Sequence, residues 1–175
     1  MKLTFNERLR TIFQEPVAQV KAMGVAEKQT VADIGSGFGF FTLAAAEVVG
    51  RDGFVYSVEP VPQRSERIRS RIKAEGIENV KVLTTGAEYL DEIPSEVVDT
   101  AFSAFSLHHF EDPPVAMAEI RRILHTGGLF YVWDRVPGRI MKHGTRPEDI
   151  TRLSPSFENL EILSSRRILR ARLTK

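Results

Sequence analysis

The sequence has no cysteine among its 175 residues. This absence excludes disulfide bonds, thiolate nucleophiles and zinc sites with cysteine ligands, while it is compatible with any redox compartment. No apolar run approaches the roughly 18 residues that a helix needs to cross a bilayer. The first ten residues mix charged and apolar side chains and lack the apolar block of a signal peptide. We therefore expect a cytoplasmic protein that has no membrane partner.

A large net charge is also missing, because 24 lysine and arginine residues balance 23 acidic residues to a formal charge of +1. Such a balance gives no global attraction to nucleic acid. The excess is local, since residues 139–175 contain nine lysines and arginines against four acidic residues. With 42% hydrophobic and 27% charged residues, the chain has the composition of one ordinary globular domain that spans residues 1–175.

Three glycines at alternate positions follow an acid-ended apolar segment, in residues 31–46, which read VADIGSGFGFFTLAAA. The apolar residues predict a strand, the glycines a tight turn and the alanine-rich run a helix. A turn of this kind places backbone N–H groups and the positive end of a helix at the edge of a sheet where nucleotide-like ligands bind. A plain strand-to-helix turn needs fewer glycines, so the pattern favours a ligand site.

The spacing of these glycines argues against NAD. A dinucleotide fingerprint reads G-x-G-x-x-G, whereas Gly35, Gly37 and Gly39 read G-x-G-x-G and the third dinucleotide position is Phe40. Asp33 lies two residues before the first glycine. A carboxylate at that place suits a cationic ligand better than a pyrophosphate.

The segment Asp33-Ile34-Gly35-Ser36-Gly37-Phe38-Gly39 resembles the first motif of class I methyltransferases, which bind S-adenosylmethionine. Residues 79–88, 102–113 and 124–134 resemble the later motifs of that family in their order and spacing. The resemblance thus covers about residues 30–134. It implies S-adenosylmethionine as the cofactor, with Asp33, Gly35, Ser36, Gly37 and Gly39 at its binding loop. Residues 1–29 are then an N-terminal helical part, and residues 135–175 an irregular segment and a final hairpin.

Alternating strands and helices predict an α/β fold that is doubly wound, with a mostly parallel sheet and helices on both faces. The predicted helices are two short ones within residues 6–23, then residues 40–49 and 62–75, and a helix that begins at Asp112 and is ended by Gly127 and Gly128. The first predicted strand ends at Ile34, and the later predicted strands are residues 54–59, 80–84, 97–103 and 129–134. Residues 135–154 are predicted to be irregular, and residues 160–163 and 168–173 to form a hairpin. The family resemblance implies that this hairpin completes a seven-stranded sheet in the order 3-2-1-4-5-7-6, with an antiparallel strand.

Glu59 ends the predicted second strand, twenty residues after Gly39. A doubly wound fold places an acid at this distance beside the ribose hydroxyls, and both carboxylate oxygens can accept from a vicinal diol. The alternative is an exposed carboxylate at the end of a strand. The resemblance adds Ala87 and Glu88 beside the adenine, although Gly86 stands where the family commonly has aspartate. The alternative for Glu88 is a capping role, because an acid at the start of a helix also stabilises the N-terminal end of that helix.

Ser103, by resemblance, lies with the two residues that follow it at the methionine end of the cofactor. His108 and His109 are candidate catalytic residues, because a neutral imidazole near the methyl group can remove a proton from an acceptor at physiological pH. The competing interpretation is that one ring packs on the following helix and the other bonds the turn at residues 110–113. Adjacent histidines share one ion poorly, so no metal site is predicted.

The acceptor is the least defined partner. Residues 102–113 are similar to small-molecule methyltransferases, including those of quinone biosynthesis, and the Asn/Asp-Pro-Pro-aromatic signature of enzymes that methylate amino nitrogens is absent. A small-molecule acceptor is favoured, whereas an RNA or protein acceptor, a domain of this fold without catalysis, and the oligomeric state stay open. The four arginines of the final hairpin, Arg166, Arg167, Arg170 and Arg172, suit either RNA or, as we favour, the protection of an edge strand.

Overall fold

The computed structural model of the protein describes residues 15–138, 142–164 and 166–175. The helices are α2 (Pro16–Ala22), α3 (Phe40–Val49), α4 (Pro62–Glu75), the 3₁₀ helix η1 (Leu107–His109), α5 (Pro113–Ile123) and α6 (Pro147–Leu153). The strands are β1 (Thr30–Ile34), β2 (Phe54–Val58), β3 (Val80–Leu83), β4 (Val98–Ala104), β5 (Leu124–Arg135), β6 (Asn159–Ser164) and β7 (Ile168–Thr174). Of the two helices predicted near the N-terminus, the second is α2, and the first lies outside the described residues.

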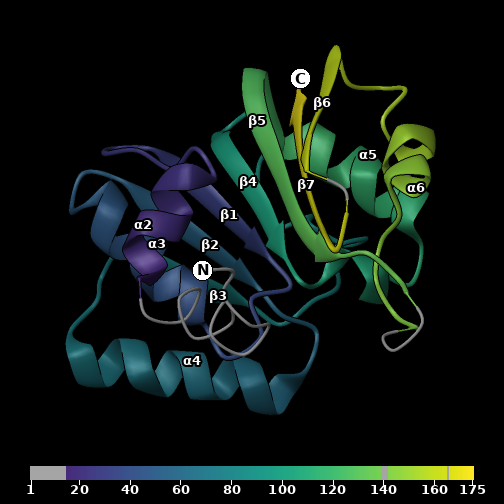
Figure 1. The fold of residues 1–175 in the computed structure, drawn as a ribbon. Coiled ribbons are helices and arrows are strands. Elements are labelled where there is room, and N and C mark those ends of the chain that lie inside the picture. Colours follow the sequence, from purple (N-terminus) through teal and green to yellow (C-terminus); the bar gives the residue numbers. More distant parts are fainter. Residues whose placement is uncertain (1–14, 139–141, 165) are drawn as a thin grey trace, which may run out of the picture.

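The strands form one seven-stranded sheet in the order β3-β2-β1-β4-β5-β7-β6. Strands β1 to β5 are parallel to one another, whereas β7 runs antiparallel to both β5 and β6. This order and the final hairpin confirm the predicted fold class. Because β1 lies between β2 and β4, the segments that leave the carboxyl ends of these three strands meet at one edge of the sheet (Figure 1).

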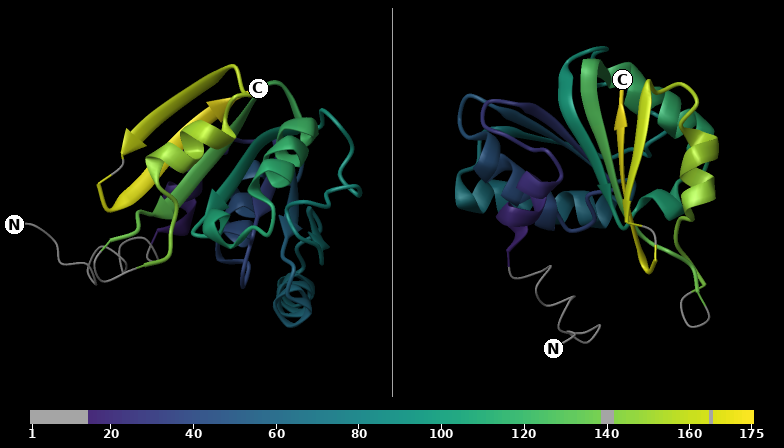
Figure 2. Two further views of the ribbon diagram at one scale, coloured as in Figure 1. Left: turned by 90° about the vertical axis from the view of Figure 1, so that its right-hand side faces the viewer. Right: turned by 45° about the horizontal axis from the view of Figure 1, so that its top comes forward.

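Helices cover both faces of the sheet, as Figures 1 and 2 show. On one face, Val20 and Met23 from the α2 region and Phe41 of α3 pack on Val31, Phe102 and Trp133 of the sheet. On the other face, Ala116 and Ile120 of α5 and Ile150 of α6 pack on Phe130 and Leu169. The two apolar layers hold the sheet between them, which fixes the positions of the loops at its carboxyl edge.

The predicted elements around the glycine turn have the expected bounds. Helix α3 begins at Phe40 and ends at Val49, with Gly50 as its cap. Helix α4 begins at Pro62, which is suited to a first helical position, and ends before Gly76, whose φ of 63° is left-handed. These are the positions at which local sequence signals are strongest, so the sequence alone locates them.

The boundary between α5 and β5 differs from the prediction. The two glycines Gly127 and Gly128 were expected to end the helix, but α5 ends at Ile123 and β5 begins at Leu124. Both glycines lie inside β5, at an irregularity in its pairing with β4. Gly127 has a φ of 80°, and its N–H donates to the Lys175 carbonyl at 2.7 Å. The glycines therefore form a bulge in a strand instead of a helix cap.

Two further predictions are wrong. The segment between β3 and β4 contains turns and no helix, so Glu88 does not open one. The segment at residues 135–154 was predicted to be irregular, yet it contains α6, in which Pro147 is the first residue and Asp149 Oδ2 accepts the N–H of Arg146 at 3.0 Å. Pro147 followed by two acids is a helix start that the prediction overlooked.

The protection of an edge strand does not explain Arg170 and Arg172. Their strand, β7, lies between β5 and β6 and is not an edge. Arg170 lies over the ring of Trp133 with 4.8 Å between its Cζ atom and the ring centroid, and Arg172 forms an ion pair with Glu161 at 3.6 Å. Both arginines thus have partners on the sheet itself.

None of the helices in the described part of the chain combines the length and the apolar character needed to span a membrane.

Candidate functional site

The glycine turn connects β1 to α3 in a left-handed backbone conformation. Gly35 and Ser36 donate their N–H groups to the Val58 carbonyl at 2.8 and 2.9 Å, which fastens the turn to the end of β2. Gly35 has a φ of 78°, and a Cβ there would lie 2.6 Å from Ser106 Oγ. Gly37 has a φ of 59°, and a Cβ there would meet nothing within 4 Å. Close packing therefore requires glycine at position 35, whereas Gly37 borders open space.

Glu59 lies directly after β2, as the sequence predicts, and is only 2% exposed. Its Oε2 accepts the N–H of Gly37 at 2.8 Å, and its Oε1 accepts the N–H of Val61 at 3.0 Å. Arg64 Nη1 lies 3.6 Å from Oε1. These three contacts hold the carboxylate against the glycine turn. Each oxygen keeps acceptor capacity, because an ionised carboxylate offers about four lone-pair sites.

Asp33 is buried behind the turn. Its Oδ2 accepts from Thr42 Oγ1 at 2.7 Å, and Thr42 in turn contacts Ser57 Oγ at 3.2 Å. Ser57 Oγ donates to Ser36 Oγ at 2.8 Å, so a chain of hydroxyls joins Asp33 to the glycine turn. Burial raises the pKa of Asp33 from 3.8 to about 7, the nearby charge of Glu59 contributes to the rise, and the hydrogen bond from Thr42 opposes it.

A cavity of about 500 Å³ lies beside the turn, at the carboxyl edge of the sheet. Six of the predicted site residues line it: Gly35, Gly37, Glu59, Ala87, Glu88 and His109. They come from the ends of β1, β2, β3 and β4, which the fold brings to one edge. The cavity is within the range of about 300 to 1,000 Å³ that is typical of small-molecule sites.

Five of the predicted residues do not line the cavity. These are Asp33, Ser36, Gly39, Ser103 and His108. Ser103 is buried and its Oγ lies 2.7 Å from Oγ of Ser106, which does line the cavity. Gly39 is the N-cap residue of α3. Asp33, Gly39 and Ser103 are buried behind the wall of the cavity, whereas Ser36 and His108 are partly exposed.

Glu88 has a structural partner in addition to its place on the cavity. Its Oε1 accepts the N–H of Asp112 at 3.1 Å, and so ties the segment after β3 to the start of α5. A Cβ on Gly86 would lie 2.6 Å from Glu88 Oε2. The absence of the family's aspartate at position 86 leaves the space that the Glu88 side chain fills.

The two histidines lie on the side of the cavity that follows β4. His109 lines it and its ring centroid is 3.9 Å from that of His108. Partial burial lowers the pKa of His109, and the neighbouring His108, Arg135 and His143 act in the same direction, whereas Asp134 opposes them. His109 is therefore held toward its neutral form, which is the form that can accept a proton.

Sequence reasoning missed several residues of this region. Arg64 and Tyr89 line the cavity, and Tyr89 is 63% exposed. Phe38, in the turn, is 58% exposed, and the Cζ atoms of Arg64 and Arg67 lie 5.5 and 5.3 Å from its ring centroid. Asp134, at the end of β5, accepts from His108. The rule that identified Glu59, an acid at the carboxyl end of a parallel strand, applies to Asp134 as well.

A larger hollow of about 930 Å³ lies between α2, α3 and α4, away from this edge. None of the predicted site residues lines it. Pro16, which does line it, is close in sequence to residues 1–14, which the structure does not describe. We therefore assign the site to the smaller cavity. Within the described residues, no group of three histidine, aspartate or glutamate side chains is arranged to hold a metal ion.

Residues 32–132 match the family model of the methyltransferase domain, which is more than half of the chain. The chain belongs to the class I S-adenosylmethionine-dependent methyltransferases. The solved structure of an S-adenosylmethionine-dependent methyltransferase from Aquifex aeolicus superposes with a TM-score of 0.76 at 20% identity, and the match covers 91% of this chain and 89% of that one. At this identity the superposition supports the fold.

Among sequence relatives of this methyltransferase, the protein-L-isoaspartate O-methyltransferase of Ignicoccus hospitalis is 41% identical over 64 residues, which are 37% of this chain and 30% of that protein. The demethylmenaquinone methyltransferase of Geobacillus stearothermophilus is 27% identical over 110 residues, or 63% of this chain and 47% of that protein. The chain thus spans half or less of the length of these two relatives.

The cofactor of the family, S-adenosylmethionine, fits the residues that surround the cavity. Glu59 presents a fixed carboxylate to one side, Gly37 leaves the space above the turn free of side chains, and Ala87 supplies an apolar wall.

Proposed function

We propose that this methyltransferase transfers a methyl group from S-adenosylmethionine to a small-molecule acceptor. The observation that carries the proposal is the cavity of about 500 Å³, which lies between Glu59 and the open side of Gly37 on one flank and His109 on the other. One flank is suited to the adenosyl group and the other to the acceptor.

In this proposal Glu59 accepts from the ribose hydroxyls, and the glycine turn and Ala87 surround the remaining adenosyl group. Asp33, Ser36, Gly39 and Ser103 support that wall from behind. When bound, the cofactor would supply an electrophilic methyl group on a positive sulfur, which would keep the electron pair of the carbon–sulfur bond. The protein's own contribution is alignment and the exclusion of water, for which effects of roughly 7 to 11 kcal/mol are available in favourable cases.

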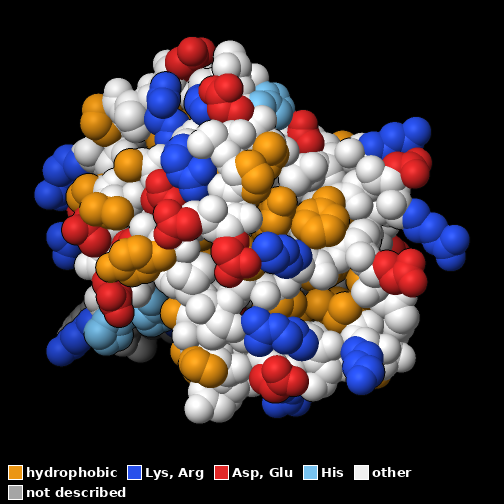
Figure 3. All heavy atoms as spheres, turned by 180° about the vertical axis from the view of Figure 1, so that it is seen from behind, with side chains coloured by type: hydrophobic (Ala, Val, Ile, Leu, Met, Phe, Trp, Pro, Cys, Tyr) orange, Lys and Arg blue, Asp and Glu red, His pale blue; other side chains and the backbone are white. Residues whose placement is uncertain are grey.

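A small acceptor is favoured by the size of the cavity, about 500 Å³, and by two relatives whose names specify small acceptors, demethylmenaquinone and aklanonic acid. The formal net charge of +1 does not favour RNA, and on the face seen from behind in Figure 3 acidic and basic side chains are interspersed with no wide area of one sign. A protein acceptor is the second candidate, because two protein-L-isoaspartate O-methyltransferases match 37% and 48% of the chain.

The cofactor is tested by calorimetric titration with S-adenosylmethionine, S-adenosylhomocysteine and NAD. We expect binding of the first two and none of NAD; binding of NAD alone would contradict the proposal. The acceptor is tested with methyl-labelled cofactor and a panel of a reduced demethylated naphthoquinone, an aromatic carboxylic acid and an isoaspartyl peptide. Label in the peptide and in neither small molecule would establish the protein acceptor instead.

A further inference from the structure

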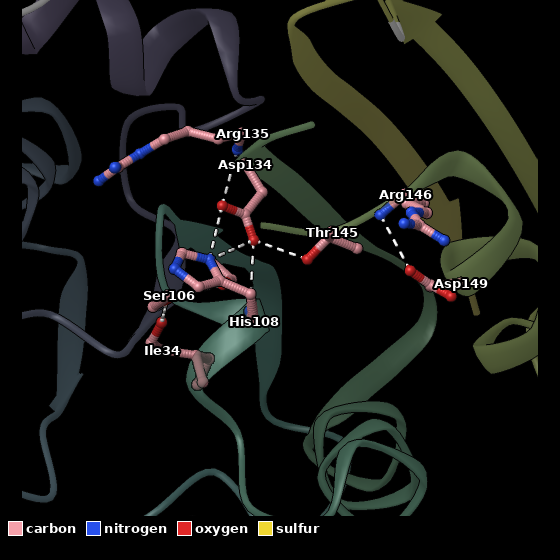
Figure 4. A network of polar contacts seen from close by, with 9 residues as sticks. Ile34, Ser106, His108, Asp134, Arg135, Thr145, Arg146 and Asp149 are labelled. Carbon is pink, nitrogen blue, oxygen red and sulfur yellow. Dashed lines mark hydrogen bonds and ion pairs between the residues drawn. The ribbon is translucent and has the colours of Figure 1, made fainter. Parts of the chain in front are cut away.

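Asp134 is the most heavily hydrogen-bonded side chain at the carboxyl edge of the described sheet, and it is fully buried. His108 Nδ1 lies 2.8 and 2.9 Å from its two oxygens, and the backbone N–H of His108 donates to it at 3.3 Å. Thr145 Oγ1 and the N–H of Arg135 donate to it, each at 2.7 Å. Figure 4 shows these contacts converging on one carboxylate. It joins the end of β5, the 3₁₀ helix η1 and the segment before α6.

The carboxylate determines which nitrogen of His108 carries the proton. An ionised carboxylate only accepts hydrogen bonds, so the nitrogen that faces it, Nδ1, carries the hydrogen. In a neutral ring the free lone pair is then on Nε2, on the other side of the imidazole. Among the described residues nothing donates to Nε2, and in Figure 4 this nitrogen points away from Asp134.

The place of this ring connects it to the acceptor side of the cavity. The ring of His108 lies against that of His109, which lines the cavity, at an interplanar angle of 44°, and the His108 side chain is 6% exposed. Ser106, two residues earlier, also lines the cavity and is fixed because its Oγ donates to the Ile34 carbonyl at 2.6 Å. The histidine pair therefore lies on the part of the site that follows β4, whereas Glu59 lies on the part that follows β2.

We propose that Asp134 is a positioning residue, which together with Thr145 holds His108 with Nδ1–H toward the carboxylate and keeps Nε2 as the atom that takes the acceptor's proton. The inference rests on the proposed methyl transfer. The proton passes from the acceptor atom to Nε2, and the electrons of the broken bond stay on the acceptor atom, which uses them for its bond to the methyl carbon. The resulting imidazolium is stabilised by Asp134 and returns its proton to solvent.

The orientation is tested by ¹⁵N nuclear magnetic resonance of the histidine rings in the whole protein, with and without S-adenosylhomocysteine. The signals of His108 are assigned with the His108→Ala variant. We expect wild-type His108 to be a single Nδ1–H tautomer at a pH where the ring is neutral. In Asp134→Asn the amide can donate to Nδ1, so the Nε2–H tautomer should appear. An Nε2–H tautomer in the wild type, or no change in the variant, overturns the inference.

Thr145→Val and Thr145→Ser provide a second comparison if Asp134→Asn does not fold. Only serine keeps the hydroxyl that donates to Asp134 and helps to fix its carboxylate, so with an acceptor from the panel above only valine should slow turnover, and equal turnover in the two variants overturns the inference. With an acceptor from the panel above, Asp134→Asn should slow turnover by about tenfold or more while the affinity for S-adenosylhomocysteine changes by less than about twofold. If Asp134→Asn turns over as fast as the wild type, the inference is overturned. Absence of cofactor binding contradicts the proposed function instead, and the tautomer measurement is independent of it.

Discussion

The N–H of Gly37 donates to Glu59 Oε2 at 2.8 Å, across 22 residues of sequence. The bond joins the turn after β1 to the residue that follows β2, so the carboxylate is already directed toward the cavity. Prearranged groups of this kind bind a ligand with little further ordering of the protein.

Glu59→Gln should weaken binding of S-adenosylhomocysteine by about 10-fold to 100-fold, because hydrogen bonds to charged groups contribute about 1.5 to 3 kcal/mol. An amide has one acceptor oxygen where the carboxylate has two, and it cannot serve Gly37, Val61 and a diol together. Calorimetry provides the measurement, with the exposed Glu66→Gln on α4 as the control. Unchanged affinity in Glu59→Gln would remove this residue from the cofactor site.

Gly37→Ala and Gly76→Ala form a matched pair. Gly37 has a φ of 59° and Gly76 a φ of 63°, and a Cβ at either position meets nothing within 4 Å. Both substitutions should destabilise the fold by about 1 to 2 kcal/mol, the cost of a left-handed non-glycine residue. Only Gly37 lines the cavity at the sheet edge, so only Gly37→Ala should reduce affinity for S-adenosylhomocysteine. Equal affinities in the two variants would place the cofactor elsewhere.

Asp33 makes stability depend on pH. Its pKa of about 7 in the folded state exceeds 3.8, so between these values the folded state binds more protons than the unfolded state. The free energy of unfolding then decreases as pH rises from about 4 to 7 and is constant above, with a total change on the order of a few kcal/mol. Asp33→Asn keeps an acceptor for Thr42 and removes the charge. Urea unfolding at pH 5 and pH 8 should show a smaller decrease in this variant than in the wild type, and equal decreases would contradict the shift.

The sequence located the elements that local signals define. Helix α3 begins and ends as predicted, because the glycine turn before Phe40 and Gly50 after Val49 mark both ends. Asp112 is the N-cap of α5, as predicted, since its Oδ1 accepts the N–H of Val115 at 3.2 Å. Glu59 was located by the topological rule for parallel strands. The cofactor-binding roles of these residues stay predictions.

The features that the sequence did not locate depend on partners far along the chain. Gly127 bulges within β5 because its N–H reaches Lys175, whereas a glycine pair after a helix ordinarily indicates a cap. The segment after β3 needs no helix, since Glu88 is held by the N–H of Asp112. The sequence predicted Asp134 only as the last residue of a strand. Its contacts with His108 and Thr145 join segments that are far apart in the chain, so no local pattern predicts them.

Arg122 on α5 anchors the segment after β3, which contains the cavity residues Ala87 and Glu88. Its Nη2 donates to the Leu90 carbonyl at 2.9 Å, and its Nη1 donates to the Ile93 carbonyl at 3.0 Å. Both of these apolar residues are fully buried. Because that segment has no helix of its own, the guanidinium replaces the hydrogen bonds that a helix would supply.

Arg122→Ala should therefore destabilise the fold by about 1 to 3 kcal/mol, because it leaves the Ile93 carbonyl without its arginine donor and leaves the Leu90 carbonyl with the Ile93 N–H alone. The control is Arg152→Ala, which removes an exposed pair with Asp149 and should change the unfolding free energy by less than about 1 kcal/mol. Urea unfolding measures both variants. The affinity for S-adenosylhomocysteine should fall in Arg122→Ala alone, since the cavity wall at Ala87 and Glu88 loses its anchor. Similar stabilities in the two variants would show that the segment is held by its apolar contacts instead.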